Sequence, residues 1–192
     1  MGNQAHRPPR RLILVKHGQP KIDPDAAPTT WPLSDEGRAA ATALAGKLDR
    51  FEPVALASSS ELKAVQTAQA IAAVLGLPLS QDAGLGEQRN ETGGFHDQQV
   101  FEALVARMFQ EPHHLVLGEE TGEAARRRFA DALDRQMAAH PDGTLVVVAH
   151  GRVISLWAAQ VLGVDAMPLW KHLGLATALV ISADRDDFEI VA

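Results

Sequence analysis

Short apolar runs that end at glycine, proline or polar residues are the clearest pattern along this chain. The runs at 11–16 (RLILVK), 54–58 (VALAS) and 144–149 (TLVVVA) have the length and apolar character of buried strands. Two further apolar runs, at 176–182 and 188–191, predict the strands that complete a sheet.

Apolar residues at helical spacing fill the segments between these runs. After Ser34, which has the chemistry of an N-cap, an alanine-rich segment predicts a helix to about Arg50. Leu44, Leu48 and Phe51 would lie on one side of it. The same reasoning predicts four more helices, at 61–75, 97–110, 119–139 and 151–162. Because strands alternate with helices, we predict an α/β fold with a largely parallel sheet.

Composition and charge narrow the classes of function. The chain has no cysteine, which excludes disulfides, thiolate zinc sites, iron–sulfur clusters and a cysteine nucleophile. Its formal net charge of −6 argues against a general nucleic-acid binder. Its apolar runs are far shorter than the ~20 residues of a membrane span. We therefore expect a cytoplasmic protein without nucleic-acid or membrane partners, with a flexible leader at 1–10 and one domain at 11–192.

Two of the predicted strands are followed by the same dipeptide, His17-Gly18 in one case and His150-Gly151 in the other. In open α/β sheets, ligands bind beyond the carboxyl ends of the strands, so we expect both imidazoles in one site. The helix that starts at Gly151 would direct free N–H groups at an anion. A histidine taken singly is more often a core or surface residue, and the other six histidines are interpreted in that way.

These groups suit chemistry on phosphorus. An imidazole can act as a nucleophile, and a phosphoryl group is stabilised by cations and oriented N–H donors. Lys16 directly precedes His17, and Lys63 opens a helix after another strand, so both are candidates to bind an anionic substrate. A single lysine is usually a solvated surface residue, but Lys16 ends a buried strand. The adjacent pair His113-His114 lacks the i, i+4 spacing of a helical metal site, so no metal or other cofactor is expected.

Several short motifs resemble, in order along the chain, those of the histidine phosphatase superfamily, also called the phosphoglycerate mutase-like family. The family's Arg-His-Gly followed by Glu or Gln is similar to KHGQ at 16–19, and its Val-x-His-Gly is similar to VAHG at 148–151. Further matches are PLSDEGRAA at 32–40, SSSELKAVQTA at 58–68, LGE at 85–87 and GEE at 118–120.

The resemblance implies a three-layer α/β/α sandwich around a mostly parallel sheet, and it also implies roles for single residues. His17 would be the phosphorylated nucleophile, and His150 would stabilise the transferring phosphoryl group. Glu87 would give a proton to the leaving oxygen and later accept one from water, with Glu91 as the rival carboxylate. Such an acid needs a raised pKa, which we expect from partial desolvation of its loop. The implied substrate-binding residues are Lys16, Lys63 and Gly151.

Two departures from the family pattern occur together, because lysine stands at 16 and 63 where the family has arginine. The positive charge is kept, but the planar fork that binds two phosphate oxygens is lost. Ser60 and Glu61 also stand where the family's third motif has proline and leucine. Either the lysines bind phosphate as point charges, or the chain is a degenerate member that binds phosphorylated ligands without turnover. Both histidines and a carboxylate at the acid position are kept, which favours activity.

We therefore predict a metal-independent phosphatase that acts through phospho-His17 on a small phosphorylated substrate. A phosphoglycerate mutase-type phosphotransferase is less favoured, because the modest segment at 97–117 offers little to cap the site and keep water out. A non-catalytic phospholigand-binding protein is the second hypothesis. A metal-dependent hydrolase is disfavoured, because the acidic residues near the two histidines lack ligand spacing. Neither the phosphoester nor the oligomeric state follows from the sequence.

Overall fold

The apolar runs form the centre of the sheet in the computed structural model, which describes residues 10–91 and 96–192. Strands β1 (Arg11–Lys16) and β4 (Thr144–Ala149) pair in parallel, with Lys16 opposite Ala149. The strand order is β3-β2-β4-β1-β5-β6, and β5 is antiparallel to β1. The other strands are β2 (Pro53–Ser58), β3 (Leu79–Gln81), β5 (Thr177–Ser182) and β6 (Phe188–Val191), with β3 and β6 at the edges. The predicted α/β class with a mostly parallel sheet is confirmed.

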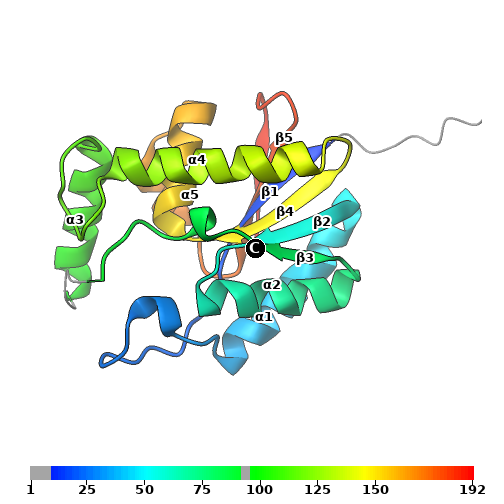
Figure 1. Cartoon of the computed structure of the whole chain (residues 1–192), viewed down its shortest axis with the longest axis horizontal. Coiled ribbons are helices and arrows are strands. Elements are labelled where there is room, and N and C mark those ends of the chain that lie inside the picture. The colour runs from blue at the N-terminus through cyan, green and yellow to red at the C-terminus, as the bar shows by residue number, and fades with distance from the viewer. Residues whose placement is uncertain (1–9, 92–95) are drawn as a thin grey trace, which may run out of the picture.

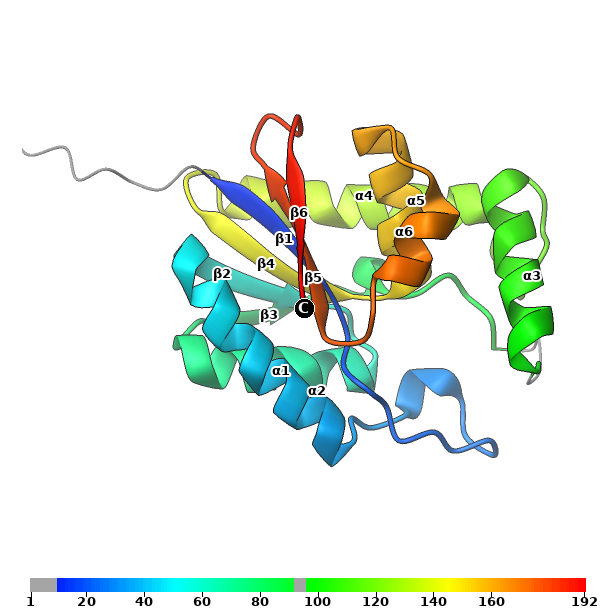
Figure 2. The same cartoon turned by 180° about the vertical axis from the view of Figure 1, so that it is seen from behind.

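Helices cover both faces of this sheet, because its central strands are apolar on both sides. In β1, Leu12 and Leu14 face the core shared with α4 and α5, while Ile13 and Val15 face the core shared with α1 and α2. Figures 1 and 2 show these two helical layers on opposite sides of the strands. The predicted three-layer arrangement is therefore confirmed.

The helices are α1 (Asp35–Leu48), α2 (Leu62–Leu75), α3 (Gln98–Gln110), α4 (Gly122–Ala139), α5 (Gly151–Leu162) and α6 (Ala166–His172). Helix α3 lies away from the sheet, where it contacts α6 (Figure 2). Short 3-10 turns occupy Pro28–Thr30, Asp49–Phe51 and Ala83–Leu85. All five predicted helices are present, whereas β3 and α6 were not predicted.

Local hydrogen bonds set the helix ends. Ser34 is the N-cap of α1 as predicted, because its Oγ accepts from the backbone N–H of Gly37 at 3.0 Å. The predicted start of the long helix at Glu119 is wrong. Thr121 caps α4 instead, and Glu120 turns back to pair with Arg128 at 2.8 Å.

In residues 10–91 and 96–192, no helix has the length and apolar character needed to cross a membrane. Residues 1–9 of the predicted leader, and residues 92–95, lie outside the described residues. The single domain at 11–192 remains a prediction.

Candidate active site

The pairing of β1 with β4 brings the two strand-end histidines together. Parallel strands end at the same edge of a sheet, and the backbone N–H of His17 donates to the carbonyl of Ala149 at 3.0 Å. The ring centroids of His17 and His150 are 5.2 Å apart. Two residues far apart in the sequence thus share one site, as the sequence predicted.

The His17 ring has one nitrogen available for chemistry. Its Nδ1 lies 2.8 Å from the carbonyl oxygen of Gly18. A carbonyl oxygen can only accept, so Nδ1 carries the proton and Nε2 keeps its lone pair. Burial, together with the nearby His150, holds the pKa of His17 well below its usual range. The ring is therefore neutral, with Nε2 in the form that a nucleophile needs.

Gly18 and Thr67 fix the backbone behind this ring. The backbone N–H of Gly18 donates to Oγ of Thr67 at 3.0 Å. A Cβ atom at position 18 would lie 2.7 Å from the carbonyl oxygen of Gly37, which is too close for any side chain. The glycine after His17 is thus required by the approach of the α1 backbone.

The His150 ring is fully buried and lies against the loop after β2. Its Nε2 is 2.9 Å from Oγ of Ser59 and 3.3 Å from Oε1 of Glu61. Its Nδ1 has no hydrogen-bond partner among the described residues. Burial lowers the pKa of His150, while the carboxylates of Glu61 and Glu87 oppose that effect.

Glu87 lies at the N-terminus of α5. Its carboxylate accepts from the backbone N–H groups of Arg152 and Val153, both at 3.2 Å, and from that of Gln88 at 2.9 Å. The expectation that the start of α5 favours an anion is met here by a side chain of the protein itself.

The expected rise in the pKa of Glu87 is wrong for this structure. Burial acts to raise that pKa, but the charges of Arg152 and His150 and the N–H of Gln88 hold it below its usual range. The carboxylate is desolvated, but it rests against a cation and a helix N-terminus, which favour its charged form. Glu91, the rival carboxylate, is exposed.

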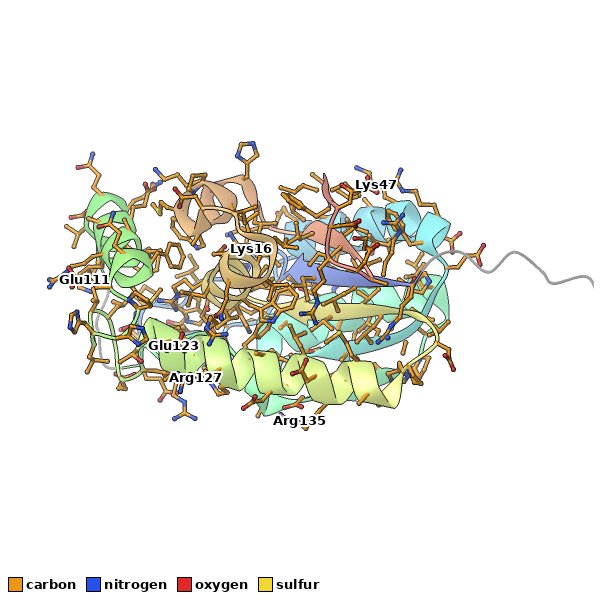
Figure 3. The ribbon with its side chains drawn as sticks, turned by 90° about the horizontal axis from the view of Figure 1, so that it is seen from above. Lys16, Lys47, Glu111, Glu123, Arg127 and Arg135 are labelled. Atoms are coloured by element: carbon orange, nitrogen blue, oxygen red, sulfur yellow. The ribbon has the colours of Figure 1, made fainter. Side chains whose placement is uncertain are left out.

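The two lysines at the family's arginine positions have different partners. Lys16 Nζ donates to the carbonyl of Leu173 at 2.8 Å, and its pKa is lowered by burial. A Cβ atom on Gly151 would lie 3.2 Å from Cε of Lys16, so this side chain passes over the start of α5. Figure 3 shows Lys16 in the interior of the molecule, beside α5. Lys63 Nζ donates to Oε2 of Glu61 at 2.6 Å and to the carbonyl of Pro28 at 2.8 Å.

Comparison with known proteins identifies the family. The pattern of the histidine phosphatase superfamily, branch 1, matches residues 12–192. The chain belongs to the histidine phosphatase superfamily. It is 30% identical over 187 residues to the glucosyl-3-phosphoglycerate phosphatase of Mycolicibacterium vanbaalenii, an alignment that covers 88% of this chain and 82% of that protein.

Two solved structures illustrate the range of similarity. The complex of mycobacterial glucosyl-3-phosphoglycerate phosphatase with inorganic phosphate is 26% identical, with a TM-score of 0.70 and coverage of 95% of this chain and 96% of that one. The phosphoserine phosphatase of Entamoeba histolytica in complex with 3-phosphoglyceric acid is 18% identical, with a TM-score of 0.74 and coverage of 95% of each chain. The second likeness concerns the fold alone.

Sequence reasoning missed two side chains of this candidate site. Glu61 contacts His150 and Lys63, and Arg152 lies 3.4 Å from the carboxylate of Glu87 with its guanidinium over the ring of Phe101. The sequence did contain a signal for Arg152. A cation in the first turn of a helix is unfavourable beside the positive end of the helix dipole, so its presence there indicates a specific role. For Glu61, the signal was an acid two residues before the motif's cation.

No group of three or more histidine, aspartate or glutamate side chains within the described ranges is arranged to hold a metal ion. A cavity of about 370 Å³ lies at the opposite ends of β1 and β4, beside Leu12 and Leu145, and none of the site residues line it. The groups described above lie at the carboxyl edge of the sheet, away from this cavity.

Proposed function

We propose that this histidine phosphatase family member is a metal-independent phosphomonoesterase that passes a phosphoryl group from a small phosphorylated substrate to His17 and then to water. The observation that carries this proposal is the buried, neutral His17 ring, whose Nε2 keeps its lone pair beside a second imidazole. The curated relative is a phosphatase, which supports hydrolysis over a mutase reaction.

The first half of the reaction is transfer to the protein. The Nε2 lone pair of His17 forms a bond to phosphorus while the bond between phosphorus and the leaving oxygen breaks. The leaving oxygen takes a proton from Glu87. His150, the ammonium groups of Lys16 and Lys63, and the N–H groups at the start of α5 stabilise the charge on the phosphoryl oxygens.

The second half returns the protein to its starting state. Water attacks the phosphorus of phospho-His17, its proton passes to Glu87, and the phosphorus–nitrogen bond breaks. Inorganic phosphate leaves, with His17 Nε2 carrying its lone pair again. No group other than the substrate and water is consumed.

Glu87 must be protonated at the first step although it is ionised in this structure. A phosphate dianion that takes the N–H groups of Arg152 and Val153 would separate the carboxylate from its donors. It would also place a like charge beside it, and both changes raise the pKa of a carboxyl group. The substrate would thereby convert Glu87 into the acid that the reaction needs.

A non-catalytic, phospholigand-binding protein is the second candidate. The observation that favours it is the pairing of pocket cations inside the protein, because Lys63 contacts Glu61 and Arg152 contacts Glu87. These pairs reduce the positive field that a phosphoryl transfer site requires.

Turnover and trapping together separate the two candidates. The purified protein would be assayed with chelator present against a panel of phosphoesters that includes glucosyl-3-phosphoglycerate, phosphoglycerates and phosphoserine. We expect release of phosphate and an acid-labile, base-stable phosphoryl adduct, both absent in His17→Ala and both kept in His113→Ala, which alters an exposed histidine. Phosphate-dependent stabilisation with neither turnover nor adduct would identify a binding protein instead.

A further inference from the structure

Glu61 occupies the N-cap position of α2 but does not cap that helix. Other N-cap side chains in this chain, such as Ser34, Asp97 and Thr121, each accept a hydrogen bond from their own helix. The Glu61 side chain makes no such bond and lies instead in the active site, with only 11% of its surface exposed. A buried carboxylate placed there needs partners of opposite charge or N–H donors.

Three separate donors surround this carboxylate. Its Oε1 accepts from the backbone N–H of Glu87 at 2.7 Å and lies 3.3 Å from Nε2 of His150. Its Oε2 accepts from Nζ of Lys63 at 2.6 Å. Glu61 therefore joins the segment that carries the proposed acid, the second histidine and the cation at the family's arginine position.

The ring nitrogens of His150 are not equivalent. Nε2 lies between Ser59 and Glu61, whereas Nδ1 is buried without a partner among the described residues. A neutral ring that donates from Nε2 presents a lone pair at Nδ1, which repels a phosphoryl oxygen. Only the imidazolium form donates from both nitrogens.

We propose that Glu61 is a positioning residue that holds His150 as an imidazolium while a phosphoryl group is bound, so that Nδ1–H can donate to a phosphoryl oxygen. Glu61 accepts the proton on Nε2 and fixes the orientation of the ring. This inference rests on the proposed function, and it assigns a role to a residue at which the chain departs from the family pattern.

The charges around His150 give the direction of the effect. Burial favours the neutral ring, and the nearby cations favour it too, whereas carboxylates favour the charged ring. The titratable and charged groups that face His150 are His17, Glu61, Lys63, Glu87 and Arg152. The pKa of Glu61 is lowered to about 2, so its negative charge persists at neutral pH. Glu61 also offsets the charge of Lys63, which would otherwise act against a proton on His150.

The variant Glu61→Gln tests this role, because an amide keeps the size of the side chain and removes its charge. The first readout is the pKa of His150 in the ligand-free protein, measured by NMR titration and assigned with His150→Gln. We expect a decrease of about one pH unit or more, since an opposite charge at this distance shifts a pKa by roughly one to three units. Glu52→Gln, an exposed acid at the other end of β2, is the matched control and should leave the pKa of His150 unchanged.

The second readout is the pH dependence of turnover and of inorganic phosphate binding. If the imidazolium is needed, the alkaline limb of both profiles should move to lower pH in Glu61→Gln, with partial recovery in Glu61→Asp. Activity near neutral pH should fall by about tenfold or more for a limb displaced by one unit, and it should recover as the pH is lowered. A merely structural role would reduce activity by the same factor at every pH.

The two proposals fail in distinguishable ways. An unchanged pKa of His150 in a folded Glu61→Gln protein, with turnover and a phospho-His17 adduct in the parent chain, overturns the role of Glu61 alone. A lowered pKa and a displaced phosphate-binding profile, without turnover in the parent chain, support the role of Glu61 and overturn the phosphatase proposal. Urea unfolding of each variant verifies that it is folded.

Discussion

Lys16 and Lys63 carry the same charge but lie in different surroundings. Lys16 is held by a main-chain carbonyl and passes over the start of α5, where Gly151 leaves room for it. Lys63 is buried and already paired with Glu61. An ammonium group has three N–H donors, so each lysine keeps donor capacity beyond the protein contacts described above. Both are therefore still suited to bind phosphate oxygens as point charges.

Substitution of these lysines tests that assignment. Lys16→Ala or Lys63→Ala should lower kcat/KM on a small phosphoester by about 100-fold, the loss typical of one electrostatic donor in a transition state. The double change Lys16→Arg with Lys63→Arg should preserve or raise activity, because the charge is kept and the planar fork is restored. Lys171→Ala, which alters a lysine on α6 paired with Glu102, is the control. Activity that is indifferent to the alanine changes would contradict the assignment.

The sequence predicts only the part of the site that lies at the ends of the strands. His17 and His150 lie where two parallel strands end, so their convergence follows from the pattern of apolar runs. The surroundings of Glu87 and Glu61 depend on a loop and a helix start that meet only in the folded chain. For this reason the direction of the Glu87 pKa was predicted wrongly, and Glu61 was read as a departure from a motif rather than as a partner of His150.

The secondary structure shows which sequence patterns predict strands and helices reliably. Apolar runs of six residues at β1 and β4 gave strands with the predicted bounds, because both faces of these strands are buried. Strand β3 has three residues, and α6 has seven with Pro168 inside it, so neither has enough periodicity to be recognised. Their formation depends on packing, β3 against β2 and α6 against α5.

The first turn of α4 carries a charge cluster with a predictable response to pH. Glu123 accepts from Arg126 at 2.8 Å and from Arg127 at 2.6 Å, and these contacts lower its pKa to about 2. Figure 3 shows Glu123 and Arg127 along α4, at the edge of the molecule. The negative charge near a helix N-terminus adds to the effect.

Glu123→Gln should therefore destabilise the protein by about 1 kcal/mol or less near neutral pH. The folded pKa lies below the ordinary value of 4.5, so this contribution is fully present above that value and is lost as the pH falls toward about 2. Urea unfolding at several pH values should show the two proteins converging in acid. Thr121→Ala, which removes the N-cap of the same helix, should cost about 1 kcal/mol at every pH. A difference for Glu123→Gln that persists at the lowest pH would contradict the ion-pair account.

Five segments from four separate stretches of the sequence converge on the candidate site. They are the end of β1, the start of α2, the loop at Glu87, the end of β4 and the start of α5. Both layers of helices and the sheet between them therefore contribute to it. A ligand that contacts all of these segments binds the folded chain and not the unfolded one, so binding and folding are linked.

This linkage predicts that an anion that mimics phosphate stabilises the whole molecule. Vanadate at about 100 times its dissociation constant should add about 2.7 kcal/mol to the free energy of unfolding. For a chain of this length, that corresponds to an increase in Tm of roughly 5–10 °C, measured by differential scanning calorimetry at constant ionic strength. Low concentrations of vanadate avoid the general stabilisation that concentrated phosphate gives to proteins.

Lys63→Ala should need a higher vanadate concentration for the same increase in Tm, whereas Lys171→Ala should follow the parent chain. A Tm that does not depend on vanadate would show that the anion does not bind the folded chain, and an equal dependence in Lys63→Ala would show that it binds elsewhere than among these five segments.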